Sequence, residues 1–172
     1  MKIEIEQFNP CREALQFRQQ FNSFEKAWKA CPRGDWMLWI AQKLDVDLKT
    51  LTLAKGYCAN TVIKLMKDKR SKNAVKLAIK FGKGLVELPE LNAAYAAADA
   101  AYAAADAAAY AADAADAAYA AAYAAYAAYA ADVADVAAYA ANAAKVKNQK
   151  QTAKICRKYL TKAVIKKINL LS

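Results

Sequence analysis

The sequence contains no histidine, and this absence excludes several kinds of catalytic site. Ser-His-Asp and Cys-His hydrolases, imidazole proton shuttles and His-ligated zinc all need that side chain. No pair of carboxylates with a neighbouring base suggests another chemistry. We therefore expect a protein that is not an enzyme, with no catalytic residues, no cofactor and no bound metal.

Cysteine is scarce and scattered, because Cys11, Cys31, Cys58 and Cys156 form no Cys-x-x-Cys pair. Zinc sites usually use closely spaced ligand pairs, and disulfide frameworks belong to short secreted chains. We expect four reduced thiols that pack as small buried side chains. The first residues lack the apolar run of a signal peptide, so the cytoplasm is the expected location.

Glycine and proline are also rare, and neither occurs after Pro89. The length of 172 residues suits one domain. Signals for helix starts recur through the first half of the chain. The expected N-caps are Asn9, Asp35, Asp47 and Ser71, and Asn22-Ser23-Phe24-Glu25 is an expected capping box. They predict helices over about 10–21, 24–31, 36–44, 48–66 and 71–81, with another from about residue 89. The expected fold is an all-α, single-domain, multi-helix bundle, and only the first eight residues hint at a strand.

Residues 93–144 contain 35 Ala, eight Tyr, six Asp, two Val and one Asn. Alanine has the highest helix propensity, so this tract predicts helix. Its Tyr and Asp residues recur at a mean step of about 3.4, shorter than the helical turn of about 3.6, so the stripe rotates around the axis. One straight helix of this length is too long for a compact domain, and we predict a break between about residues 113 and 123. A membrane span is excluded, because each Asp costs about 2.5–3.5 kcal/mol at the bilayer centre.

The first part of this stripe is a candidate partner surface. Exposed tyrosine clusters suit protein interfaces, and each carboxylate lies one turn from a ring. The alternative is an alanine-packed scaffold in which Tyr and Asp provide shape and solubility. The candidate residues are Tyr95, Asp99, Tyr102, Asp106 and Tyr110.

Charge is distributed unevenly along the chain. Residues 1–90 hold 17 basic and 10 acidic residues, residues 91–144 hold six Asp, and residues 145–172 hold nine basic residues, giving +7, −6 and +9 of the net +10. We expect a helical body, an alanine-rich helical layer and a basic amphipathic helix with these boundaries. The apolar stripe of that last helix is Ala153, Cys156, Leu160, Val164, Ile168 and Leu171.

The basic residues suggest an anion-binding site, although a solvated face would leave the same pattern. Three tryptophans within residues 28–39 predict an aromatic corner of the core, beside which Arg33 and Asp35 lie at a helix N-terminus. The candidate anion-binding residues are Arg33, Arg70, Lys150, Lys154, Lys158 and Lys162.

A family resemblance covers about residues 11–145. Its residues are Trp28, Cys31, Arg33, Asp35, Trp36, Met37, Leu38 and Trp39, then Leu53, Ala54, Tyr57, Cys58, Ala59 and Val62, then Arg70, Ala74, Val75, Ile79, Phe81, Lys83 and Gly84, followed by the alanine tract. In this order they resemble a family of small bacterial immunity proteins associated with polymorphic toxin genes. The resemblance implies an all-helical protein that neutralises a toxin or effector by binding it. It supplies no established site, and the Tyr and Asp of this tract replace the Arg and His common in the family.

Three functions remain open at this point. The first is a non-enzymatic, immunity-like protein with a toxin or effector as partner. The second is a binder of nucleic acid or of an anionic nucleotide, for which a phage counter-defence role is conceivable. The third is a purely structural helical module. No membrane is expected as a partner, and the sequence does not set the oligomeric state.

Overall fold

The computed structural model describes residues 5–65, 69–94, 96–97 and 127–171. Within these ranges every regular element is helical, so the predicted all-α class is confirmed. The elements are η1 (Ile5–Phe8), α1 (Arg12–Gln19), α2 (Phe24–Ala30), α3 (Gly34–Lys43), α4 (Leu48–Asn60), η2 (Ile63–Leu65), α5 (Lys69–Gly82), a helical segment over 88–94, and α7 (Ala127–Leu171). The predicted break between 113 and 123 lies outside the described residues.

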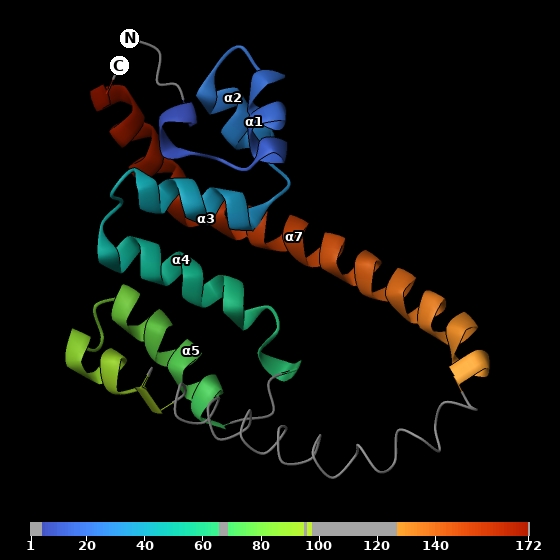
Figure 1. Ribbon diagram of the computed structural model, residues 1–172. Coiled ribbons are helices and arrows are strands. Elements are labelled where there is room, and N and C mark those ends of the chain that lie inside the picture. Colours follow the sequence, from blue (N-terminus) through green and yellow to red (C-terminus); the bar gives the residue numbers. More distant parts are fainter. Residues whose placement is uncertain (1–4, 66–68, 95, 98–126, 172) are drawn as a thin grey trace.

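The helices of the body lie in layers beside the long helix α7 (Figure 1). Helix α4 packs against α5 on one side and against α3 and α7 on the other. Helix α2 contacts both α1 and α7, so the two short helices cover the C-terminal half of α7. The first turns of α7 project past the body (Figure 1).

One main core joins the body to α7. It includes Trp28 of α2, Met37 of α3, Ala54 of α4, and the α7 residues Cys156 and Leu160. The predicted α7 stripe is confirmed, since every member whose side chain is described is buried: Ala153, Cys156, Leu160, Val164 and Ile168. A second, smaller cluster of Ala78, Phe81 and Leu91 lies under α5.

Two glycines let α4 and α5 approach each other closely. A Cβ atom on Gly56 would lie 2.9 Å from Cγ1 of Ile79, and one on Gly82 would lie 2.7 Å from Cα of Leu53. Contacts this short do not occur between real side chains, so the backbones meet where a side chain is missing. This role of Gly56 was not predicted, because the residue lies inside a predicted helix.

Several predicted helix ends are confirmed. The Asp47 carboxylate accepts a hydrogen bond from the backbone N–H of Thr50 at 2.9 Å. At the predicted capping box the cap is Ser23, one residue after Asn22, and its hydroxyl accepts a hydrogen bond from the backbone N–H of Lys26 at 3.2 Å. Both contacts satisfy donors that a helix N-terminus leaves unpaired. Gly84 has a φ of +72°, a left-handed conformation that ends the α5 segment as expected.

Four other local predictions were wrong. Ser71 is not the cap of α5, because that helix begins at Lys69 and contains Ser71. Asn9 is not the cap of α1, because it takes a left-handed φ of 52° and the helix begins after Cys11, which makes no side-chain cap bond. Asp35 is not the cap of α3, because the helix begins at Gly34 after Arg33. The hint of a strand also failed where it can be checked, since Ile5–Phe8 forms a 3-10 turn.

Two helix lengths differ from the prediction. Helix α4 ends at Asn60 rather than near residue 66, and the Thr61 hydroxyl donates to the Cys58 carbonyl at 2.7 Å where the helix stops. Helix α7 has 45 residues, so the basic segment is not a separate helix beginning at residue 145. No glycine or proline interrupts α7, and at 1.5 Å per residue it is about 67 Å long.

Candidate functional site

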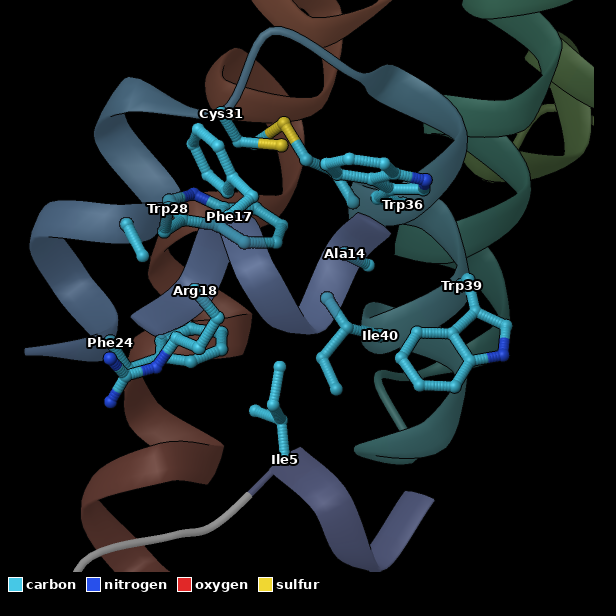
Figure 2. Close-up of a pocket in the computed structure, with 12 residues that line it drawn as sticks. Ile5, Ala14, Phe17, Arg18, Phe24, Trp28, Cys31, Trp36, Trp39 and Ile40 are labelled. Carbon is cyan, nitrogen blue, oxygen red and sulfur yellow. The ribbon is translucent and has the colours of Figure 1, made fainter. Parts of the chain in front are cut away.

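The three tryptophans form an aromatic corner of the core, as predicted. Trp28 is buried, and its Nε1–H donates to the Thr161 hydroxyl of α7 at 3.0 Å. Figure 2 shows Trp28, Trp36 and Trp39 around a cavity of about 60 Å³ that Phe17 and other apolar side chains also line. Small-molecule sites usually measure about 300–1,000 Å³, so this cavity is a packing feature of the corner.

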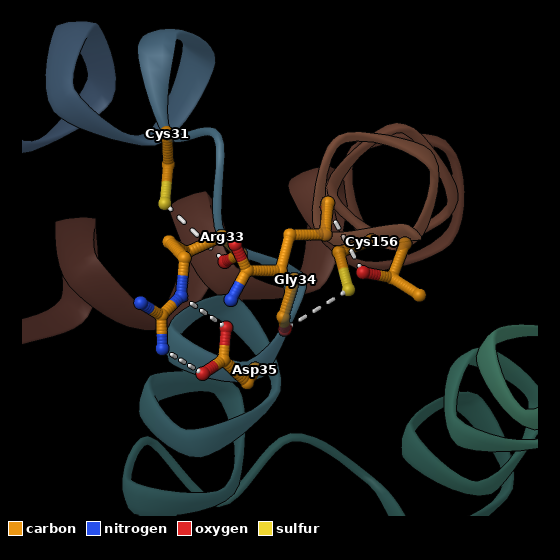
Figure 3. A network of polar contacts seen from close by, with 7 residues as sticks. Cys31, Arg33, Gly34, Asp35 and Cys156 are labelled. Carbon is orange, nitrogen blue, oxygen red and sulfur yellow. Dashed lines mark hydrogen bonds and ion pairs between the residues drawn. The ribbon is translucent and has the colours of Figure 1, made fainter. Parts of the chain in front are cut away.

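Arg33 and Asp35 bind each other rather than a ligand. The guanidinium donates to both carboxylate oxygens of Asp35, at 2.9 and 2.6 Å (Figure 3), and lies 4.7 Å from the centroid of the Trp36 ring. The hydrogen bonds from Arg33 hold the pKa of Asp35 below its usual value, and Asp35 raises the pKa of Arg33. The predicted anion-binding role of Arg33 would therefore require it to leave this pair.

The turn before α3 is tied to α7 by polar contacts. Nη1 of Arg157 donates to the Cys31 carbonyl at 2.6 Å, and the Cys156 thiol donates to the Gly34 carbonyl at 3.5 Å (Figure 3). A Cβ atom on Gly34 would collide with Thr152, so only glycine fits here. Arg157, counted among the basic residues of the tail, is thus a structural residue.

The cysteines are free thiols, and three of the four are buried as expected, whereas Cys11 is exposed. The Sγ atoms of Cys58 and Cys156 lie 3.9 Å apart between α4 and α7. The contact with Cys58 and burial raise the pKa of Cys156, and burial raises the pKa of Cys31. Both thiols therefore stay protonated and pack as small side chains.

The exposed side of α7 carries a regular row of lysines. Lys150, Lys154, Lys158 and Lys162 are all exposed and follow one another at four-residue steps, about 6 Å along the axis. We call these four residues the lysine ridge. None of them forms an ion pair with a carboxylate in the part of the chain that the structure describes. The structure therefore brings four of the six candidate anion-binding residues together on one face.

The other candidates do not join the ridge. Arg33 precedes α3, and Arg70 is exposed in the first turn of α5 and already has an interaction partner. The candidate partner surface lies outside the described residues: Tyr95, Asp99, Tyr102, Asp106 and Tyr110.

Sequence reasoning missed one cluster beside the ridge. Tyr57 of α4 and Tyr159 of α7 stack with ring centroids 4.8 Å apart and planes 5° apart. Nζ of Lys83 lies 5.8 Å from the Tyr57 centroid, and Nζ of Lys158 lies 5.2 Å from the Tyr159 centroid. We call these four residues the Tyr–Lys cluster. No sequence signal identifies it, because its members come from three separate parts of the chain.

Comparison with known proteins found no matching family model, no matching curated protein and no matching solved structure. Among the described residues, no group of three or more Cys, Asp or Glu side chains is placed to hold a metal ion. No helix in the described ranges is both long and apolar enough to cross a membrane.

Proposed function

We propose that this protein is a non-enzymatic, immunity-like binding protein that neutralises a toxin or effector protein by stoichiometric binding. The observation that carries the proposal is the lysine ridge, whose four exposed ammonium groups have no carboxylate partner among the described residues. The order of motifs that resembles bacterial immunity proteins supplies the class of partner. The ridge adds that the partner presents an acidic surface.

The packing of α7 suits it to this role. Its buried stripe anchors one side of the helix in the main core, so the opposite side is held as a fixed row of charges. A row of like charges on a rigid element accelerates association with a complementary surface and disfavours wrong partners. Lysine heads can also adjust their positions on long stems, which lets one row meet carboxylates at uneven spacing.

The free thiols are relevant to the cellular compartment in which the protein acts. The structure has Cys58 and Cys156 as free thiols, with sulfur atoms 3.9 Å apart. Reduced neighbouring thiols are typical of reducing compartments. The proposal therefore places the protein in the cytoplasm, where a toxin or effector acting on the same cell would be met.

Co-expression with the proteins encoded beside its gene tests the proposal. We expect one of them to co-elute with the full chain in size-exclusion chromatography. The complex should be lost when Lys150, Lys154, Lys158 and Lys162 are all replaced by Glu. A matched control replaces four exposed lysines outside α7 by Glu, namely Lys64, Lys69, Lys76 and Lys80. Equal loss of binding in both variants would show that the net charge of the protein, and not the position of the lysine ridge, is responsible for binding.

A second candidate is nucleic-acid binding, and the even spacing of the ridge favours it. A row of ammonium groups that advances about 6 Å along the helix axis and turns by about 40° at each step can follow a phosphate backbone, releasing condensed counterions as it binds. Binding would then weaken steeply with salt, with a slope in log–log form of about −0.9 for each phosphate neutralised on duplex DNA. A complex that nuclease treatment dissolves would support this candidate over the first. A chain that retains neither protein nor nucleic acid would favour the purely structural role.

A further inference from the structure

The Tyr–Lys cluster brings together four hydrogen-bond donors from three elements. Tyr57 and Tyr159 approach from α4 and α7, Lys158 follows from α7, and Lys83 comes from the turn after α5. Both tyrosines are half-buried and both lysines are exposed, so the cluster is held by its rings and open at its ammonium groups.

The two lysines are not neutralised where they stand. Neither Lys83 nor Lys158 forms an ion pair with a carboxylate within the described ranges. Each ammonium group instead faces an aromatic ring, a weaker partner than a carboxylate. Both charges therefore stand beside the stacked pair without a carboxylate partner among the described residues.

The electrostatic environment of the tyrosines favours negative charge. The pKa of Tyr57 is lowered, first by its hydrogen bond with Lys83 and then by that with Tyr159, with further contributions from the charges of Lys83 and Lys158. The same donors and charges that favour a phenolate would favour an external oxyanion at this position.

We propose that Tyr57, Tyr159, Lys83 and Lys158 form an oxyanion site that binds a phosphate group. A phosphate monoester carries a charge of about −1.5 to −2 and three acceptor oxygens, which matches two ammonium groups and two hydroxyls. A carboxylate carries one charge and leaves donors unused. The site does not depend on the proposed protein partner, and Lys83 lies outside the lysine ridge.

Two kinds of ligand could supply this phosphate group. It belongs either to a small phosphorylated molecule or to a nucleic-acid backbone. Lys158 belongs to both the cluster and the ridge, so a strand held at the cluster would continue along α7. Inorganic phosphate and a short oligothymidylate serve as the two probes, with sodium acetate as the carboxylate probe.

The test follows the backbone amide signals of residues 57, 83, 158 and 159 by NMR on the ¹⁵N-labelled full chain, at constant ionic strength set with chloride. We expect saturable shifts with phosphate, and an affinity about tenfold lower in Lys83→Gln, as for one charge-assisted hydrogen bond. Tyr57→Phe, which keeps the ring stack and removes a hydroxyl, should also weaken binding. Lys166→Gln, an exposed lysine two turns further along α7, is the control and should leave the affinity unchanged.

The outcomes separate the possibilities. If oligothymidylate binds no more tightly than inorganic phosphate, the result supports a small phosphorylated ligand. Much tighter binding of oligothymidylate, still weakened by Lys83→Gln, supports a nucleic-acid backbone at the same site. The proposal is overturned if acetate acts as strongly as phosphate, if Lys166→Gln weakens binding as much as Lys83→Gln, or if no saturable shift occurs. None of these results depends on whether a toxin or effector is captured.

Discussion

At the scale of single residues, the polar groups before and at the start of α3 serve the structure. The guanidinium of Arg33 is held by the carboxylate of Asp35 and by the ring of Trp36. An anion that binds Arg33 would therefore have to compete with both of these partners. The four lysines of the ridge on α7 have no carboxylate partner among the described residues.

The Arg33–Asp35 pair should make stability depend on acid pH. Because the pKa of Asp35 is lowered in the folded state, the pair stabilises the fold above the unfolded-state value of about 3.9, and this contribution disappears as the pH falls through the folded-state pKa. The Asp35 side chain is 55% exposed, so we expect Asp35→Asn to cost no more than about 1 kcal/mol at pH 6. Denaturant unfolding at several pH values measures this, and the difference from wild type should shrink as the pH falls through the folded-state pKa of Asp35. A difference that grew towards acid would contradict the assignment.

Gly34 should be among the least replaceable residues of the chain. An added Cβ atom would meet Thr152, including its backbone, so the N-terminus of α3 would have to move away from α7. We expect Gly34→Ala to lower the free energy of unfolding by about 1–3 kcal/mol, as overpacking does in close-packed cores. Lys43→Ala, exposed at the end of the same helix, is the control and should change it by less than about 0.5 kcal/mol. Equal stability of the two variants would show that α3 and α7 are not in close contact there.

At the scale of elements, the sequence predicts what its local patterns encode. The Asp47 cap and the apolar stripe of α7 are confirmed, because a cap acts within one turn and a stripe needs only the helical repeat. The start of α1 and the cap of α3 were misassigned, because Asn9 takes a left-handed conformation and Asp35 has a better partner in Arg33.

Contacts between distant segments could not be predicted in the same way. The pairing of Tyr57 with Tyr159 and the fit of Gly34 against Thr152 each depend on how helices far apart in sequence cross. No periodicity within either helix encodes that crossing. This is also why the candidate anion-binding residues divided, with the lysines on one face and the arginines elsewhere.

The α7 stripe should carry a large part of the stability of the fold. Leu160 is fully buried in the main core, facing away from the lysine ridge. We expect Leu160→Ala to lower the free energy of unfolding by about 2–5 kcal/mol, through lost burial and the cavity left behind. Lys162→Ala, two residues along on the exposed side, should change it by less than about 0.5 kcal/mol. If chemical denaturation showed a similar loss of free energy of unfolding for Leu160→Ala and Lys162→Ala, α7 would not have one buried and one exposed side.

At the scale of the whole molecule, the fold separates a structural side from a charged side. Helices α2, α3 and α4 pack against one face of α7, with α1 behind α2 and α5 behind α4. The opposite face presents lysines without carboxylate partners among the described residues. Reversing the four ridge lysines changes only exposed side chains, so the fold should survive and binding alone should change.

The central claim is that the ridge holds a protein partner in a stoichiometric complex. Native mass spectrometry of the nuclease-treated complex with the co-encoded protein tests it most directly, with wild type beside the variant in which Lys150, Lys154, Lys158 and Lys162 are replaced by Glu. The account predicts an equimolar complex for wild type and the free chain alone for the variant, with identical circular dichroism spectra. An equimolar complex that persists in the variant would contradict it.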